Sequence, residues 1–181
     1  MEQTSQNSSW AELLRFAVIA ALIIIPIRTF IAQPFIVSGA SMDPTFKDGD
    51  YLIVDELSYH LRGPARGEVV VFHPPQNPKT YYIKRIVGLP GETVIIKDSA
   101  VSIKTEEKTF KIVEDYITDH TVPDLEKVLG NQEYFVMGDN REFSSDSRVW
   151  GALPQDHIKG RALVRILPFA TFGLLPGHFN Q

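Results

Sequence analysis

Cysteine is absent from this sequence, and histidine is sparse. A chain without cysteine can form no disulfide bond, no thiolate nucleophile and no cysteine-ligated zinc site. The five histidines are scattered, and none belongs to a short ligand pair such as H-E-x-x-H. The sequence therefore offers no candidate metal site, and we interpret its histidines as loop or surface residues.

A surplus of positive charge is also missing. The 18 Lys and Arg residues are outnumbered by 22 Asp and Glu residues, the formal net charge is −4, and no basic cluster marks one face. This balance argues against a nucleic-acid-binding protein. A length of 181 residues with 44% hydrophobic content suits one globular domain and a short additional element.

The additional element is at the N-terminus. A polar tail over residues 1–9 precedes "WAELLRFAVIAALIIIPIRTFIA" at 10–32, whose centre at 16–27 is apolar and uncharged. A helix over 10–32 would be about 33 Å long at ~1.5 Å per residue, enough to cross a hydrocarbon core of ~30 Å. Arg15 and Arg28 flank the apolar centre and could reach the two interfaces.

Three interpretations of this stretch compete. A cleaved signal peptide needs a basic region before its apolar core, whereas the tail before Trp10 carries only Glu2. A buried helix stays open, because the uncharged centre is short for a membrane span. We favour an uncleaved single-pass anchor over 10–32. With one arginine at each end, its orientation is not decided by the sequence.

From Gln33 onward the pattern changes to short apolar or alternating runs separated by turn residues. Such runs predict a mainly β fold, an antiparallel sandwich or barrel-like domain over 33–181. The stretch at 122–131 is the one plausible short helical turn. Strands are predicted over 51–57, 67–75, 80–87, 92–98, 100–105, 108–114, 132–140 and 160–167.

The C-terminal stretch "LVRILPFATFGLLPGHF" is apolar but interrupted by Arg165, Pro168 and Pro176. These interruptions exclude a second membrane span. We favour packing against the sheet, and contact with a bilayer surface is the alternative.

Three segments could carry chemistry. In "VSGASMDPTF" at 37–46, Pro44 restricts Asp43 to extended or turn geometry, and Gly39 permits a close backbone approach. A serine on such a turn can present its hydroxyl at a surface. In "MGDNREFSSDSRVWGALP" at 137–154, a polar surface loop is one interpretation, and a hydrogen-bonding shelf with a carboxylate–guanidinium pair is the other.

The remaining segment, "YYIKRIVGLPGE" at 81–92, places two cations side by side in a predicted strand. Because successive strand side chains point to opposite faces, Lys84 or Arg85 must lie among apolar neighbours. Arginine stays protonated in proteins, whereas a desolvated lysine can become neutral and act as a base, at a cost of ~4 kcal/mol for a pKa near 7 or 8. The alternative is that Lys84 extends to solvent at a sheet edge.

Together and in this order, the three segments resemble those of type I signal peptidases, the membrane-anchored Ser-Lys endopeptidases. "SGASMDPTF" is similar to the nucleophile box, "YYIKRIVGLPGE" to the general-base box and "GDNREFSSDSRVWG" to the last box. The resemblance covers nearly the whole chain. It implies that Ser41 is the nucleophile and Lys84 the general base.

The resemblance also implies supporting roles. Ser144 matches the position whose hydroxyl helps to orient the lysine amine, and Met42 would pack near the lysine stem. Asp146 and Arg148 match a structural ion pair close to the site.

Two further positions follow from the resemblance. Asp139 is a further candidate partner for Arg85 or Arg148, so that Arg85 would point away from the site. Gly39 departs from many Gram-negative members, which carry a serine there whose hydroxyl helps to form the oxyanion hole. The hole would then rest on the Ser41 backbone N–H and on a second donor that the sequence does not identify.

The implied reaction is acyl transfer without a metal or an organic cofactor. The implied substrates are secretory preproteins with small residues at the first and third positions before the cut. The implied location is the cytoplasmic membrane, with a single span, contact with membrane lipid and the catalytic domain on the extracytoplasmic side.

Two rival functions remain. A self-cleaving repressor would need a DNA-binding helical domain, and the apolar N-terminus argues against it. The other is a membrane-tethered β-domain that binds a partner without catalysis.

Overall fold

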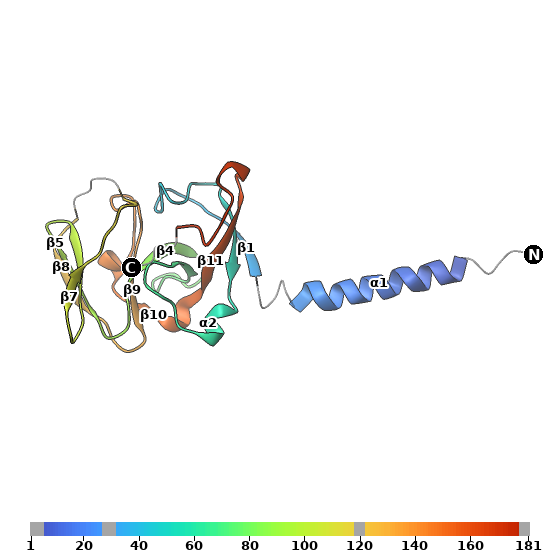
Figure 1. Cartoon of the computed structure of the whole chain (residues 1–181), viewed down its shortest axis with the longest axis horizontal. Coiled ribbons are helices and arrows are strands. Elements are labelled where there is room, and N and C mark those ends of the chain that lie inside the picture. The colour runs from blue at the N-terminus through green and yellow to red at the C-terminus, as the bar shows by residue number, and fades with distance from the viewer. Residues whose placement is uncertain (1–5, 27–31, 118–121, 178–181) are drawn as a thin grey trace, which may run out of the picture.

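The N-terminal helix is longer at its start than the sequence predicts. The computed structural model describes residues 6–26, 32–117 and 122–177, and its first element is α1 (Gln6–Pro26), which projects away from the β-domain in Figure 1. The last residues of the predicted polar tail are therefore helical, which corrects the boundary at Trp10. At the other end, Ala32 already belongs to a strand, which corrects the predicted end of the helix.

Among the helices in the described part of the chain, none has the combination of length and apolar character needed to cross a membrane. The predicted span over 10–32 includes residues 27–31, which lie outside the described residues.

The described residues after α1 form two antiparallel sheets, as the β pattern predicts (Figure 1). The larger sheet has the order β1 (Ala32–Ile36), β2 (Tyr51–Asp55), β11 (Ile158–Leu167), β3 (Val69–Phe72), β4 (Tyr82–Gly88), β9 (Glu133–Met137) and β10 (Leu153–Pro154), with β12 (Gly173–Leu174) paired to β11. The smaller sheet has the order β7 (Thr109–Lys111), β6 (Ala100–Lys104), β5 (Thr93–Lys97) and β8 (Leu125–Val128). Every predicted strand run overlaps one of these strands, and β4 and β11 extend beyond their predicted runs by one and two residues.

Within the described part of the β-domain, four short helical segments lie in the connections. Two are single turns of α-helix, α2 (Ser58–Leu61) and α3 (Ser147–Trp150). Two are 3₁₀ turns, η2 (Gln155–His157) and η3 (Phe169–Thr171). The Asp146 side chain accepts a hydrogen bond from the backbone N–H of Arg148, which caps α3.

The helical turn predicted at 122–131 is wrong. Its central residues form β8, which pairs antiparallel with β5 so that Val128 lies opposite Thr93. Leu, Glu and Lys favour helix weakly, and a preference of a few tenths of a kcal/mol per residue is overridden by pairing with a sheet that is already present.

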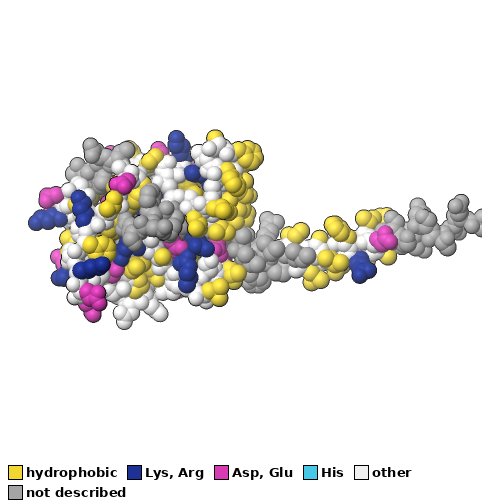
Figure 2. Space-filling model, viewed as in Figure 1, with side chains coloured by type: hydrophobic (Ala, Val, Ile, Leu, Met, Phe, Trp, Pro, Cys, Tyr) yellow, Lys and Arg dark blue, Asp and Glu magenta, His cyan; other side chains and the backbone are white. Residues whose placement is uncertain are grey.

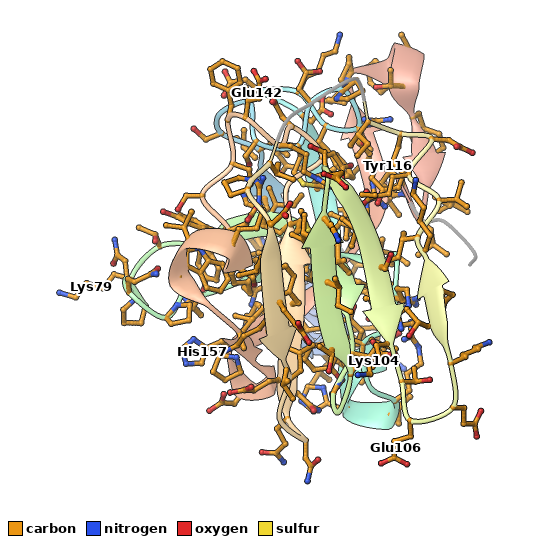
Figure 3. The ribbon with its side chains drawn as sticks, turned by 90° about the vertical axis from the view of Figure 1, so that its left-hand side faces the viewer. Lys79, Lys104, Glu106, Tyr116, Glu142 and His157 are labelled. Atoms are coloured by element: carbon orange, nitrogen blue, oxygen red, sulfur yellow. The ribbon has the colours of Figure 1, made fainter. Side chains whose placement is uncertain are left out.

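An apolar layer joins the two sheets. Val94 and Ile96 of β5 and Phe135 and Met137 of β9 belong to one buried cluster, so the small sheet packs on the large one. Each such side chain contributes about 1.5–3 kcal/mol when it leaves water. Figure 3 shows the opposite, outer side of the small sheet, where charged side chains such as Lys104 are exposed.

Candidate active site

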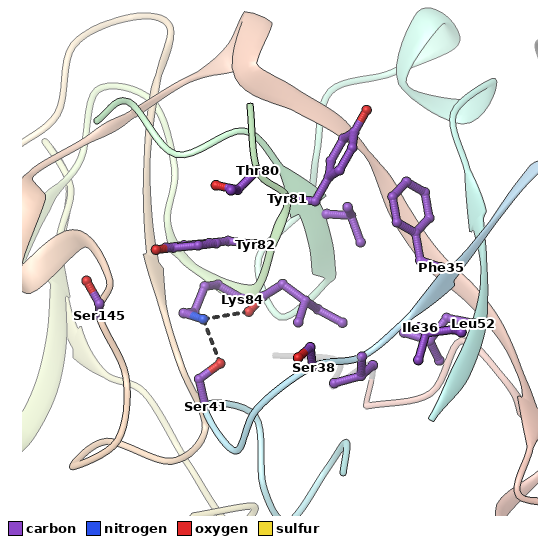
Figure 4. A pocket seen from close by; sticks show the side chains of 13 residues that line it. Phe35, Ile36, Ser38, Ser41, Leu52, Thr80, Tyr81, Tyr82, Lys84 and Ser145 are labelled. Carbon is purple, nitrogen blue, oxygen red and sulfur yellow. Dashed lines mark hydrogen bonds between the residues drawn. The ribbon is translucent and has the colours of Figure 1, made fainter. Parts of the chain in front are cut away.

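Two segments that are distant in the sequence bring Ser41 and Lys84 together. Ser41 lies on the turn that follows β1, and Lys84 lies in the middle of β4. The distance between Lys84 Nζ and Ser41 Oγ is 2.7 Å, and Nζ lies 2.9 Å from the Ile83 carbonyl oxygen (Figure 4). The amine and the hydroxyl are therefore in direct hydrogen-bond contact.

Lys84 is buried, which excludes the interpretation in which it extends to solvent. The residue is 4% exposed, lies opposite Val70 in the β3–β4 ladder and has its amine 5.3 Å from the centre of the Tyr82 ring. Burial lowers the pKa of Lys84 to about 8, although Asp146 and Asp139 partly oppose this effect. About a tenth of the amine is therefore neutral at pH 7, and about half at pH 8.

The turn that carries Ser41 is fixed from within. Gly39 has a φ of +89°, which favours glycine, and its backbone N–H donates to Asp48 Oδ1 at 2.8 Å. Phe46 N donates to the Met42 carbonyl at 2.9 Å. Met42 is fully buried in the cluster beneath the turn, against which Ile83, the residue before Lys84, also packs.

Arg85 lies on the opposite face of β4 and is paired, as the sequence predicts. Its Nε and Nη2 donate to the two carboxylate oxygens of Asp139 at 2.8 and 2.5 Å, and the guanidinium lies 4.1 Å from the centre of the Tyr116 ring. Both members of this pair are almost completely buried. The adjacent cations therefore have separate positions, one at Ser41 and one in an ion pair.

Asp146 organises the third segment in chain order, residues 137–154. It is fully buried and pairs with Arg148, with Nε and Oδ1 2.8 Å apart, and it accepts a hydrogen bond from Gly138 N at 2.9 Å. The Ser144 hydroxyl donates to Asp146 at 2.7 Å. The hydrogen bonds of the Lys84 amine within the described residues go to Ser41 and Ile83, while the Ser144 hydroxyl is bonded to Asp146.

Gly138 allows the segment at 137–154 to lie against the turn at 37–46 that carries Ser41, here called the nucleophile turn. A Cβ at this position would lie 2.4 Å from the Ser41 carbonyl oxygen and 2.2 Å from Ser144 Oγ. The backbone N–H of Asn140 donates to the same Ser41 carbonyl at 3.1 Å. A side chain at position 138 would disrupt this backbone contact between the two segments, which explains why the position requires glycine.

A cleft of about 410 Å³ opens beside the two reactive groups (Figure 4). The sequence does not identify its walls, since most are ordinary strand residues. Phe35 and Tyr81 form an edge-to-face pair with ring centres 5.0 Å apart on one side. The lining residues are Phe35, Ile36, Val37, Ser38, Ser41, Leu52, Val71, Thr80, Tyr81, Tyr82, Ile83, Lys84 and Ser145.

The chemical elements of the site suit nucleophilic catalysis. A hydroxyl in contact with a buried amine of lowered pKa can lose its proton as it attacks a carbonyl carbon. The mostly apolar cleft beside it can hold a peptide segment. Among the described residues, no group of three histidine or acidic side chains comes together that could hold a metal ion.

Known proteins resemble this chain over most of its length. Residues 10–167 match the family described as signal peptidase, peptidase S26. A probable signal peptidase I-2 from Synechocystis sp. is 37% identical over 180 residues, which cover 96% of this chain and 81% of the relative. Signal peptidase IB from Staphylococcus aureus is 35% identical over 169 residues, 85% of this chain and 87% of the relative. A signal peptidase I structure from Enterococcus faecalis V583 aligns with 55% of this chain and 97% of its own, at 29% identity and a TM-score of 0.48.

Proposed function

The chain belongs to the signal peptidase family, peptidase S26, and we propose that Ser41 is its nucleophile and Lys84 its general base. As a member it is a serine endopeptidase that removes signal peptides, which decides against a non-catalytic binding domain. The observation that carries the residue assignment is the 2.7 Å contact between Ser41 Oγ and a buried amine whose pKa is lowered to about 8.

The reaction proceeds in two steps. Neutral Lys84 accepts the Ser41 proton as Oγ attacks the scissile carbonyl, and the ammonium that forms gives this proton to the leaving amine, so that the mature protein departs and the signal peptide stays as an ester on Ser41. Lys84, neutral again, takes a proton from the water molecule that attacks the ester and returns it to Ser41 Oγ as the signal peptide leaves. The Ser41 backbone N–H supports the developing oxyanion, and one such donor is worth about 3–4 kcal/mol. The N–H of Gly39 is already bound to Asp48 and does not contribute.

The two reactive groups are supported by residues that do not react themselves, namely Asp139, Asp146, Arg148 and Ser144. Two buried ion pairs, Arg85–Asp139 and Arg148–Asp146, hold β4 and the segment at 137–154 in place near Lys84. Ser144 keeps the Asp146 carboxylate in place through its 2.7 Å hydrogen bond. Removing one partner of such a pair leaves a buried charge, which is costly.

The cleft favours preproteins with small residues before the cut. Apolar side chains of Ile36, Leu52, Val71 and Ile83 line the cleft that contains Ser41, and a substrate strand can add to the backbone there. We expect a secretory preprotein with Ala at the first and third positions to be cut after the first. Phe at the first position should lower kcat/KM about five- to 150-fold, because overpacking costs about 1–3 kcal/mol.

N-terminal sequencing of the product from the purified full chain, together with initial rates for both preproteins, measures this preference. Cleavage at another bond, or equal rates for Ala and Phe, would contradict the assignment of the cleft.

The membrane is the second proposed partner. We assign an uncleaved anchor in the N-terminal region that contains α1, with the β-domain on the extracytoplasmic side of the cytoplasmic membrane. Exposed hydrophobic side chains also gather on the side of the β-domain that faces α1 (Figure 2). Strand β1, which lies on this side in Figure 1, carries the exposed Ile36, and the segment after β11 carries the exposed Phe169, Phe172 and Leu174, all with exposed fractions of 61% or more. Apolar surface of this kind is stabilised at a lipid interface.

We expect the full chain, expressed in bacterial cells, to stay with the membrane fraction after an alkaline wash. Protease added outside spheroplasts should digest the β-domain, and a cytoplasmic marker protein serves as the control for intact cells. Release of the chain by the wash would contradict the anchor, and protection of the β-domain would contradict its orientation.

A further inference from the structure

One residue of the nucleophile turn is bound through both its side chain and its backbone. Thr45 lies four residues after Ser41, and its hydroxyl donates to Asp139 Oδ2 at 2.5 Å. This contact ties the turn to the buried Arg85–Asp139 pair beside Lys84. The carbonyl oxygen of Thr45 accepts a hydrogen bond from Arg165 Nη1 at 2.7 Å. The side chain of Thr45 is therefore held by the Arg85–Asp139 pair, and its carbonyl by Arg165.

Arg165 joins three parts of the structure that are distant in the sequence. It lies on β11, and its Nη1 also donates to Asp50 Oδ2 at 3.1 Å, where the nucleophile turn leads into β2. The guanidinium lies 5.3 Å from the centre of the Phe46 ring. Its Nε donates to the carbonyl of Thr171 in η3, at the tip beyond β11 in Figure 1.

Asp50 is a suitable anchor for such a contact because it is fixed by other bonds. It is 4% exposed, and its carboxylate accepts a hydrogen bond from Lys47 N at 3.1 Å. Its carbonyl accepts a hydrogen bond from Val37 N at 2.9 Å. Arg165 therefore binds the turn at a point where both of its ends meet.

We propose that Arg165 is a positioning residue, which holds the Thr45 carbonyl and Asp50 so that Ser41 Oγ stays within reach of Lys84. The inference depends on the proposed nucleophile and base. The planar guanidinium offers donors in a fixed fork to several acceptors at once, which a lysine ammonium cannot match. Small misplacement of a nucleophile can lower its rate about 100-fold without loss of binding.

The test is Arg165→Lys in the full chain, with Arg161→Lys as the matched control. Arg161 lies on the same strand, its side chain has nearly the same exposure, 19% against 17%, and it bonds to Asp55, Ser58 and Glu68 instead of the turn. We expect Arg165→Lys to lower kcat about ten- to a hundredfold with KM changed less than about threefold. The control should keep kcat within about threefold of the wild type.

A second measurement reports on the reactivity of the Ser41 hydroxyl without preprotein binding. The rate at which an activated ester acylates Ser41 should fall in Arg165→Lys by a factor similar to that of kcat, while the pH midpoint stays at the wild-type value. Rates are taken per folded molecule, with thermal unfolding measured for each variant, and Arg165→Gln replaces Arg165→Lys if the latter does not fold.

Unchanged kcat in Arg165→Lys, an equal loss in both arginine variants, or a loss confined to KM would overturn the inference. A shifted pH midpoint would also overturn it, because Arg165 would then act on Lys84. Failure of the proposed function is distinguished by Ser41→Ala: if that variant still cleaves, the assignment of the nucleophile is wrong whatever Arg165 does.

Discussion

Replacing Ser41 by alanine is expected to abolish preprotein cleavage. Without Oγ no ester can form at this site, and the remaining groups can only orient the substrate. In serine proteases, removal of the nucleophile lowers kcat by about 10⁴-fold or more. We therefore expect kcat for a preprotein to fall by at least about 10⁴-fold, measured with the purified full chain by product formation over time.

The folded structure should tolerate this change. Ser41 Oγ contributes one hydrogen bond, to Lys84, and the turn is held by its backbone bonds and by Met42 beneath it. The free energy of unfolding should therefore change by only about 1 kcal/mol. Ser102→Ala, in the small sheet, is the control and should cleave at the wild-type rate. Cleavage by Ser41→Ala at more than about a tenth of the wild-type rate would refute the nucleophile.

The β-domain is largely predictable from the sequence, because alternating apolar and polar residues specify which strand face is buried. Val69 to Phe72 is an exception in pattern, since its residues are buried on both faces, yet its length and β-branched residues still indicate a strand. At Leu125–Val128 the same reasoning fails. Its residues are held as a strand by pairing with β5, a partner that is distant in the sequence and that local sequence does not encode.

The site is predictable in its reacting groups and less so in its supports. Lys84 and Arg85 have equally apolar neighbours, so alternation cannot choose between them, and only the ability of lysine to lose its proton assigns the base. The contact of Thr45 with Arg165 joins residues 120 positions apart. No local pattern announces such a contact, and the bond from Ser144 to Asp146 instead of Lys84 depends on side-chain rotation.

Replacing Lys84 by methionine is expected to remove the activity. Methionine has a similar length and no basic nitrogen, so Ser41 loses its proton acceptor while the apolar surroundings stay filled. We expect kcat to fall by about 10⁴-fold or more, comparable to the loss of the nucleophile because the two groups act as a unit. In the wild type, kcat/KM should rise with pH to a plateau, with a midpoint near the pKa of about 8.

The pH dependence arises because only the neutral amine is a base. Raising the pH through about 8 converts the ammonium to that form, so the low-pH side of the profile should rise about tenfold per pH unit. A rate that is independent of pH between 6 and 9 would exclude Lys84 as the base. Lys79→Met, which changes a lysine in the exposed turn before β4, is the control and should leave the midpoint unchanged.

Lys84→Met should also stabilise the fold, which distinguishes a buried catalytic lysine from a structural one. Because the pKa of Lys84 is lowered from 10.5 to about 8, protonating it costs about 3 kcal/mol more in the folded chain than in the unfolded chain. Between pH 8 and 10.5 the unfolded state binds more protons, so wild-type stability rises with pH in this window, and below pH 8 the full cost is present.

Lys84→Met carries no such cost. At pH 7 its free energy of unfolding, measured by denaturant titration, should therefore exceed the wild-type value by about 1–3 kcal/mol, since hydrogen bonds lost from Nζ offset part of the gain. The difference should shrink towards pH 10.5. A less stable variant at pH 7 would mean that the ammonium is well accommodated where it lies, and a lysine kept protonated in that way could not serve as the base.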